Sequence, residues 1–271
     1  MMTQDNQNIC NIAAYKFVKL SNETLNELQG ALQNQCGERN LKGTILLSPE
    51  GVNLFLAGAE DAITRFRSFL TSFAVFSDLT FKVSFSKNNP FQKMRVKIKS
   101  QIIPMSVPDV HPAQSDTERI SPKDLKKWLD ESRDFTLLDT RNDYEVEFGT
   151  FKNARHLDIK TFRDFPKAIE GFGQDSETKP LVLFCTGGIR CEKAVPLMLK
   201  KGFKNVLQLD GGILKYFEEV GSEHYDGECF VFDERVALTS ELQPSGIRQC
   251  PCCFRPFRDE EHRAEGKEAE S

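Results

Sequence analysis

Residues 181–203, LVLFCTGGIRCEKAVPLMLKKGF, contain the pattern that decides the fold of the C-terminal part of the chain. Four apolar residues end at Cys185, two glycines follow, and a helical pattern begins at about Arg190. A short, fully apolar strand is typical of a parallel sheet with both faces covered. The segment therefore predicts a strand, a tight loop and a helix, with Cys185 where the strand ends.

The loop between Cys185 and Arg190 has the composition of an anion-binding turn. Its two glycines allow backbone angles that other residues resist, so consecutive N–H groups can point inward. The helix N-terminus adds partial positive charge and Arg190 adds a permanent one. Such surroundings shift a thiol toward thiolate, so we predict a reactive Cys185 assisted by Arg190. The alternative is a buried, unreactive cysteine. The residues expected to form the anion-binding loop are Thr186, Gly187, Gly188 and Ile189.

Elements on both sides of this loop alternate between strand and helix. Strands are expected at 135–139, 181–184 and 205–209. One helix is expected to open at Ser121-Pro122, and others lie at about 190–201 and 212–219. This order predicts an α/β domain with a parallel sheet over residues 121–225. Residues 226–257 form a cysteine-containing extension, and 258–271, with six acidic and three basic residues, read as a disordered tail.

The N-terminal part shows a different order. Strands are expected at 11–18, 43–48, 52–57 and 79–85, helices at 21–35 and 60–73, and a further strand at 94–103. The order β-α-β-β-α-β predicts an α+β domain of the ferredoxin-like type over residues 1–103. Prolines at 104, 108 and 112 in polar surroundings indicate a linker over residues 104–120.

Composition limits the classes of protein to which the chain can belong. Of its 271 residues, 39% are hydrophobic and 28% charged, as in soluble domains. No apolar run approaches the ~18–20 residues that a membrane helix needs, and the first ten residues lack the features of a secretory signal. We therefore expect a cytoplasmic protein without a membrane partner. The net charge of −4 argues against coating nucleic acid through bulk charge.

CTGGIRC (185–191) resembles the active loop of rhodaneses. Residues 137–159, LLDTRNDYEVEFGTFKNARHLDI, are similar to a rhodanese signature, although Thr150 stands where many rhodaneses have His. Four residues separate Cys185 from Arg190, whereas related phosphatase loops have five. The shorter loop favours a sulfur-sized group over phosphate.

Three segments extend the resemblance to one family. They are CTGGIRCEKA (185–194), FVFDERVA (230–237) and KGTILLSPEGVNLFLAG (42–58). Together they resemble the bacterial tRNA uridine hydroxylase family (TrhO), across about residues 11–255. This resemblance implies a ferredoxin-like domain followed by a rhodanese domain. It also implies an enzyme that uses molecular oxygen as co-substrate to form 5-hydroxyuridine at the tRNA wobble position, U34.

Two other function classes stay open. A sulfurtransferase would move sulfur through a persulfide on Cys185, and a non-catalytic binding module would use only the fold. The intact cysteine and arginine argue against the second. No organic cofactor is recognised, because neither a Rossmann glycine pattern nor an iron-site arrangement is present. The expected partners are tRNA and an unknown electron or sulfur donor.

A basic stretch supports the expectation of an RNA partner. Residues 82–99 contain six basic residues and no acidic one, and residues 1–100 carry 12 basic and 8 acidic side chains. In a strand, alternate side chains project on one face. The alternative is a charged sheet edge that discourages aggregation. The residues predicted to contact the RNA backbone are Lys93, Arg95, Lys97 and Lys99.

The remaining cysteines suggest two further hypotheses. Cys191, directly after Arg190, is a candidate resolving thiol for a persulfide or sulfenate on Cys185, and a small packing residue is the alternative. Cys250 and Cys253 form a C-x-x-C pair that, with Cys229, suggests a zinc site. A single such pair is weak evidence, so exposed or redox-active thiols are preferred to zinc there.

Overall fold

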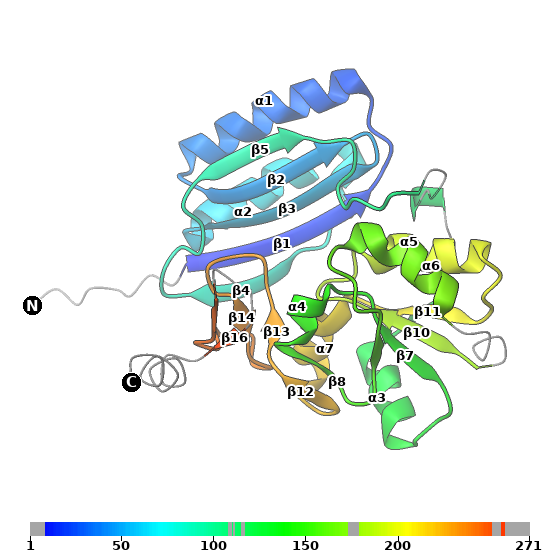
Figure 1. Ribbon diagram of the computed structural model, residues 1–271. Coiled ribbons are helices and arrows are strands. Elements are labelled where there is room, and N and C mark those ends of the chain that lie inside the picture. Colours follow the sequence, from blue (N-terminus) through cyan, green and yellow to red (C-terminus); the bar gives the residue numbers. More distant parts are fainter. Residues whose placement is uncertain are drawn as a thin grey trace, which may run out of the picture. The chain divides into compact units, whose positions relative to one another are not determined.

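The computed structural model shows two compact units. It describes residues 9–107, 110, 112–114, 117–172, 179–250 and 256–257. The first unit spans Met1–Pro104 and the second Met105–Ser271. Figure 1 shows their helices and strands and labels most of them. Among the described residues, no helix has the length and apolar character needed to cross a membrane.

The first unit contains one five-stranded sheet. Its elements are β1 (Ile9–Phe17), α1 (Asn22–Glu38), β2 (Lys42–Ser48), β3 (Gly51–Gly58), α2 (Glu60–Thr71), the 3-10 turn η1 (Ala74–Phe76), β4 (Lys82–Ser86) and β5 (Met94–Ile98). The strand order is β4-β1-β3-β2-β5, with β1–β3, β1–β4 and β2–β3 antiparallel and β2–β5 parallel. The ferredoxin-like order predicted from the sequence is therefore confirmed, with β5 added at the sheet edge.

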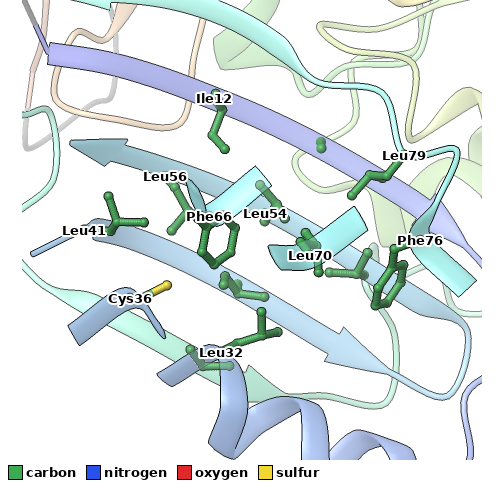
Figure 2. Close-up of a cluster of buried hydrophobic side chains, with 14 of the residues drawn as sticks. Ile12, Leu32, Cys36, Leu41, Leu54, Leu56, Phe66, Leu70, Phe76 and Leu79 are labelled. Carbon is green, nitrogen blue, oxygen red and sulfur yellow. The ribbon is translucent and has the colours of Figure 1, made fainter. Parts of the chain in front are cut away.

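The core of this unit lies between the sheet and its two helices. Helix α1 begins after Ser21, whose hydroxyl accepts a hydrogen bond from the Thr24 N–H at 3.1 Å, and so satisfies one free N–H of the first turn. Its buried stripe includes Leu32, and α2 contributes Phe66 and Leu70. Figure 2 shows these side chains meeting the apolar face of the sheet.

Strand β5 is shorter than predicted. A strand was expected over 94–103, but pairing with β2 ends after the Lys99 N–H donates to the Leu47 carbonyl at 2.8 Å. The reason is that β2 itself ends at Ser48, so no partner strand remains. Ile102 is bonded differently, because its N–H donates to the Glu50 carboxylate at 2.8 Å.

The second unit is built on a parallel sheet. Its strands are β6 (Arg119–Ile120), β7 (Thr136–Asp139), β9 (Arg155–His156), β10 (Leu181–Phe184) and β11 (Val206–Leu209), in the order β6-β11-β10-β7-β9. The helices are α3 (Pro122–Asp130), α4 (Asp143–Val146), α5 (Phe165–Ala168), α6 (Cys191–Lys200) and α7 (Gly212–Val220). All four strand pairings within this five-stranded sheet are parallel, as predicted. The 3-10 turns of this unit are η2 (Pro112–Gln114), η3 (Phe162–Asp164) and η4 (Ile169–Gly171).

Strand β10 lies at the centre of this sheet and is buried on both faces. Val182 and Phe184 pack in the cluster formed with α3 and α7. Leu181 and Leu183 are equally buried and, by strand alternation, point to the opposite face. Helix α6 packs against β10 and β11. This double covering explains why the strand reads as a continuous apolar run.

Two segments differ from the expected boundaries. Arg119–Ile120, assigned to the linker over 104–120, form β6 and pair with β11, because the edge of β11 offers free backbone groups. Part of the extension over 226–257 packs on the second unit. It contains β12 (Tyr225–Gly227), paired with β8 (Gly149–Phe151), and the pair β13 (Cys229–Phe230) and β14 (Ala237–Leu238). The pair β15 (Arg248–Gln249) and β16 (Pro256–Phe257) completes the strands. The predicted tail over 258–271 lies outside the described residues.

Candidate active site

Cys185 lies at the carboxyl end of the central strand β10, directly before the loop that leads into α6. The loop turns sharply at Gly188, whose φ of +102° is a conformation that side-chain-bearing residues rarely adopt. Cys185, Gly188 and Arg190 are buried, while Gly187 and Ile189 are half-buried. The predicted strand, loop and helix are all present.

The back of the loop is bonded to the first turn of α7. The N–H groups of Ile213 and Leu214 donate to the carbonyls of Cys185 and Thr186, at 3.0 and 3.1 Å. These are the N–H groups that a helix start leaves without partners of its own. Gly212 permits the close approach, because a Cβ there would meet the Cys185 carbonyl oxygen at 2.3 Å. The first turn of α7 therefore fixes where the two carbonyls point.

The front of the loop stabilises a negative sulfur. The Gly188 N–H donates to the Cys185 sulfur at 3.1 Å, and the Arg190 N–H and the Cys191 thiol also donate to it. Burial alone would raise the pKa of the Cys185 thiol. These hydrogen bonds and the Arg190 charge outweigh burial and hold its pKa well below 9.0. The loop therefore shifts Cys185 toward the thiolate, the state that a nucleophile requires.

The Arg190 side chain forms an ion pair with the Glu145 carboxylate. Its guanidinium donates two hydrogen bonds to Glu145, 2.5 and 2.8 Å long, and both side chains are almost fully buried. The Asn142 N–H donates to the same carboxylate at 3.1 Å and fixes its orientation at the start of α4. The sequence predicted that Arg190 would assist Cys185. Because the guanidinium pairs with Glu145, Arg190 acts on Cys185 in two other ways. Its positive charge stabilises the thiolate, and the Arg190 backbone N–H donates to the Cys185 sulfur.

Glu145 was missed by the sequence reasoning. The available signal was the spacing Asn142-x-x-Glu145, which places the carboxylate at a helix start as in a capping box. Nothing local shows that this carboxylate pairs with a side chain 45 residues away.

A second buried ion pair supports the end of β7, next to β10. Arg141 donates to the Asp139 carboxylate, with the Nη2–Oδ2 contact at 2.6 Å, and both side chains are fully buried. Nη2 of Arg141 also donates to the Gly149 carbonyl at 2.6 Å. The Thr150 hydroxyl donates to Asp139 at 2.8 Å, so Thr150 supplies a polar contact at the position where many rhodaneses have His. This network organises the start of α4 and hence Glu145.

Cys191 is the first residue of α6 and lies against Cys185. Its side chain is fully buried, its sulfur lies 3.8 Å from the Thr140 hydroxyl, and its thiol donates to the Cys185 sulfur. Burial, together with the negative charge on Cys185, raises the pKa of the Cys191 thiol well above its ordinary value. The two sulfurs are thus brought together as a thiolate and a thiol. The resolving role of Cys191 stays a prediction.

The four predicted RNA contacts lie on β5 and its two flanking positions, in the first unit. Lys93, Arg95, Lys97 and Lys99 are all exposed. Val96, between them, is buried in the core. The alternation expected of a strand is therefore present. Binding of RNA by these side chains stays a prediction.

The three cysteines considered for zinc do not form a described cluster. Cys229 is fully buried on β13, where burial raises its pKa to about 12. Cys250 is half-buried, and Cys253 lies outside the described residues. Within the part of the chain that the structure describes, no group of three or more His, Cys, Asp or Glu side chains is placed to bind a metal.

Comparison with known domains divides the chain as the structure does. A family model described as UPF0176 acylphosphatase like domain matches residues 9–102. A model described as rhodanese-like domain matches residues 121–219. A crystal structure of a rhodanese-like domain protein from Staphylococcus aureus is similar to part of the chain, with 25% identity and a TM-score of 0.32. That similarity covers 37% of this chain and 91% of that one.

Curated relatives are similar along both units. A protein of Cupriavidus taiwanensis named tRNA uridine(34) hydroxylase is 49% identical over 250 residues, which are 90% of this chain and 88% of that protein. A protein of Ralstonia nicotianae with the same name is 47% identical over 94% of this chain and 92% of its own length.

Proposed function

The chain belongs to the family of the tRNA uridine(34) hydroxylases, and from this premise we propose that it converts the wobble uridine of tRNA into 5-hydroxyuridine. The observation that carries the proposal is identity of about one residue in two over nine-tenths of the chain, across both units. The proposal includes a cytoplasmic location, because its substrate is tRNA.

The reactive group in this proposal is the Cys185 thiolate. Its sulfur adds to C6 of uracil, forming a C–S bond while the C5–C6 double-bond electrons move toward C5 and the C4 oxygen. The low pKa of Cys185 supports this role, because the nucleophile needs no separate base. The inward N–H groups of the loop stabilise the developing negative charge. The Arg190 guanidinium is occupied by Glu145 and is not the oxyanion donor.

Oxygen enters at C5, which the addition has made nucleophilic. Molecular oxygen is the proposed oxidant, and one of its atoms becomes the C5 hydroxyl. The other leaves as water, which consumes two protons and two electrons from a thiol-class reductant. Loss of the C5 proton and of the Cys185 thiolate from C6 then restores the double bond. Net, uridine, oxygen, two electrons and two protons yield 5-hydroxyuridine and water.

The exposed cations of β5 are the proposed tRNA contact. Lys93, Arg95, Lys97 and Lys99 form a one-sided row, which suits the regularly spaced phosphates of an RNA backbone. Phosphate contacts position a nucleic acid without reading its sequence. In this proposal the first unit holds the tRNA and the second carries out the chemistry.

The test combines activity with trapping. Purified protein, unmodified tRNA transcript, oxygen and dithiothreitol are incubated, and the nucleosides are analysed by mass spectrometry. We expect 5-hydroxyuridine with the unaltered chain and none with Cys185→Ser. A transcript containing 5-fluorouridine blocks loss of the C5 substituent and should leave tRNA covalently attached to Cys185. Full activity of Cys185→Ser would contradict the proposal.

A sulfurtransferase is the second candidate, and the rhodanese-like domain match favours it. In this reaction Cys185 attacks the outer sulfur of thiosulfate, releases sulfite and carries a persulfide. A thiolate acceptor then removes the outer sulfur and regenerates Cys185. Incubation with thiosulfate and cyanide distinguishes the candidates. Thiocyanate formation without any 5-hydroxyuridine would favour sulfur transfer.

A further inference from the structure

Phe232 is an exposed aromatic residue beside the cysteine loop. Its side chain is 49% exposed. Four large hydrophobic residues are exposed among the described residues: Val83, Phe85, Leu199 and Phe232. Exposing an aromatic ring forgoes the stabilisation that its burial would provide. Its position beside Arg190 of the cysteine loop therefore calls for a functional explanation.

The backbone at Phe232 is held in a short, fixed turn. Phe232 lies between β13 and β14, where the Val231 N–H donates to the Val236 carbonyl at 2.8 Å. Within the turn, Arg235 forms a largely buried ion pair with Asp233 at 2.6 Å, and its N–H donates to the same carboxylate at 3.0 Å. These contacts join the two ends of the turn and fix its backbone, so the position of Phe232 is well defined.

Buried and half-buried aromatic residues lie beneath the exposed ring. Phe232 packs edge to face on Phe230, with ring centroids 5.1 Å apart and planes at 89°. Phe230 in turn contacts Tyr144 and Phe148, at 5.4 and 5.1 Å. This packing restricts the orientation of the Phe232 ring.

Two contacts connect this aromatic group to the catalytic loop. The Arg190 guanidinium carbon lies over the Phe232 ring, 5.9 Å from its centroid. The Thr186 hydroxyl donates to the Phe230 carbonyl at 3.4 Å. Phe232 therefore borders the loop that contains Cys185, and its ring already contacts a cation on one side.

We propose that the exposed ring of Phe232 stacks on the uracil base that Cys185 attacks, and so acts as a substrate-positioning residue. This inference rests on the proposed function. A base must leave its neighbours before a buried thiolate can reach C6, and an aromatic side chain replaces the stacking that the base loses. Stacking accepts any base, so Phe232 holds the base in place while the loop chemistry selects uracil.

Substitution at Phe232 tests the role of the ring. For Phe232→Ala we expect KM for tRNA to rise about tenfold, with kcat much less affected, because stacking holds the base before and during the reaction. Phe232→Tyr and Phe232→Trp should restore KM, whereas Phe232→Leu should not. The matched control is Leu199→Ala, which removes an exposed apolar side chain at the far end of α6. A Leu variant as active as the unaltered chain would overturn the proposal.

Photo-crosslinking provides a readout that does not require catalysis. An anticodon stem-loop with 5-iodouridine at the wobble position is irradiated with the full chain, and the crosslinked peptide is identified by mass spectrometry. We expect the crosslink at Phe232. A crosslink only at other residues, by a chain that hydroxylates uridine, would refute the stacking role and leave the proposed function standing. A crosslink at Phe232 in a chain that does not hydroxylate uridine would support stacking and contradict the proposed function.

Discussion

Two hydrogen bonds, 2.5 and 2.8 Å long, join the Arg190 guanidinium to the Glu145 carboxylate across 45 residues of sequence. Both side chains are almost inaccessible to water, so each requires the other as counter-charge. This pair makes the position of the cysteine loop depend on α4. It also keeps the positive charge that stabilises the Cys185 thiolate in one place.

Glu145→Gln should destabilise the fold. The change leaves the buried Arg190 charge uncompensated, which in other proteins costs about 3–5 kcal/mol of unfolding free energy. Urea unfolding measures the loss. Glu147→Gln is the control, because Glu147 is exposed two residues away. The double variant Glu145→Gln/Arg190→Met should lose less than the sum of the single variants. Strict additivity would show that the two side chains act independently.

The rate of Cys185 alkylation should depend on pH as expected for a thiol of lowered pKa. Raising the pH converts thiol into reactive thiolate, so the rate rises with pH until the pKa is passed. Because the Cys185 pKa is held well below 9.0, the rate should level off below that pH. Iodoacetamide kinetics between pH 4 and 9 on the native protein, with Cys185→Ser as background, provide the measurement. Burial raises the pKa of Cys36 and Cys229 to about 12, so these thiols contribute little. A rate still rising at pH 9 would contradict this account.

Cys191→Ala should raise the pKa of Cys185. The substitution removes the thiol that donates to the Cys185 sulfur, so the alkylation profile should shift to higher pH. Cys191→Ser keeps a donor at nearly the same position and should shift the profile less. If Cys191→Ala leaves the profile unchanged, the backbone N–H groups and Arg190 alone account for the thiolate.

Gly212→Ala should disturb the loop. Its φ of +66° already disfavours a side chain, and a Cβ would meet the Cys185 carbonyl oxygen at 2.3 Å. Gly221→Ala is the matched control, since its φ is +87° but no atom lies within 4 Å of the added Cβ. In urea unfolding, the control should lose only the free energy of unfolding that the strained backbone costs, about 1–3 kcal/mol. Gly212→Ala should lower the free energy of unfolding by more than this, and it should also slow Cys185 alkylation. Equal effects on both measurements would argue against the contact.

Neutralising Lys97 should weaken tRNA binding in a salt-dependent way. Lys97→Gln should lower the slope of log affinity against log salt by about 1, because one phosphate contact is lost. Filter binding of tRNA between 50 and 200 mM salt measures the slope. Lys204→Gln removes an exposed cation of the second unit and should leave it unchanged. Identical slopes for both variants would show that Lys97 of the basic row on β5 does not contact the tRNA backbone.

Local sequence patterns predicted most of the architecture. The β-branched and aromatic composition of β1 and the helical spacing of Leu25, Leu28 and Leu32 each report on a few neighbouring residues, which is enough to identify an element. The apolar run at 181–184 predicted a parallel strand covered on both faces, and its central position came from the structure. Strand ends were less predictable, because β5 stops where its partner β2 stops.

The sequence by itself determined the order of elements, the position of Cys185 at a strand end and the anion-binding composition of its loop, because each depends on residues adjacent in the chain. The tertiary structure alone decided that Arg190 pairs with Glu145, that Gly212 lies against the Cys185 carbonyl and that Phe232 borders the loop. These contacts join distant segments. The first two arise because parallel strands bring their carboxyl ends to one edge of a sheet, where the loops that follow β7, β10 and β11 meet. The third arises because the antiparallel pair β13 and β14 packs against α4, which follows β7.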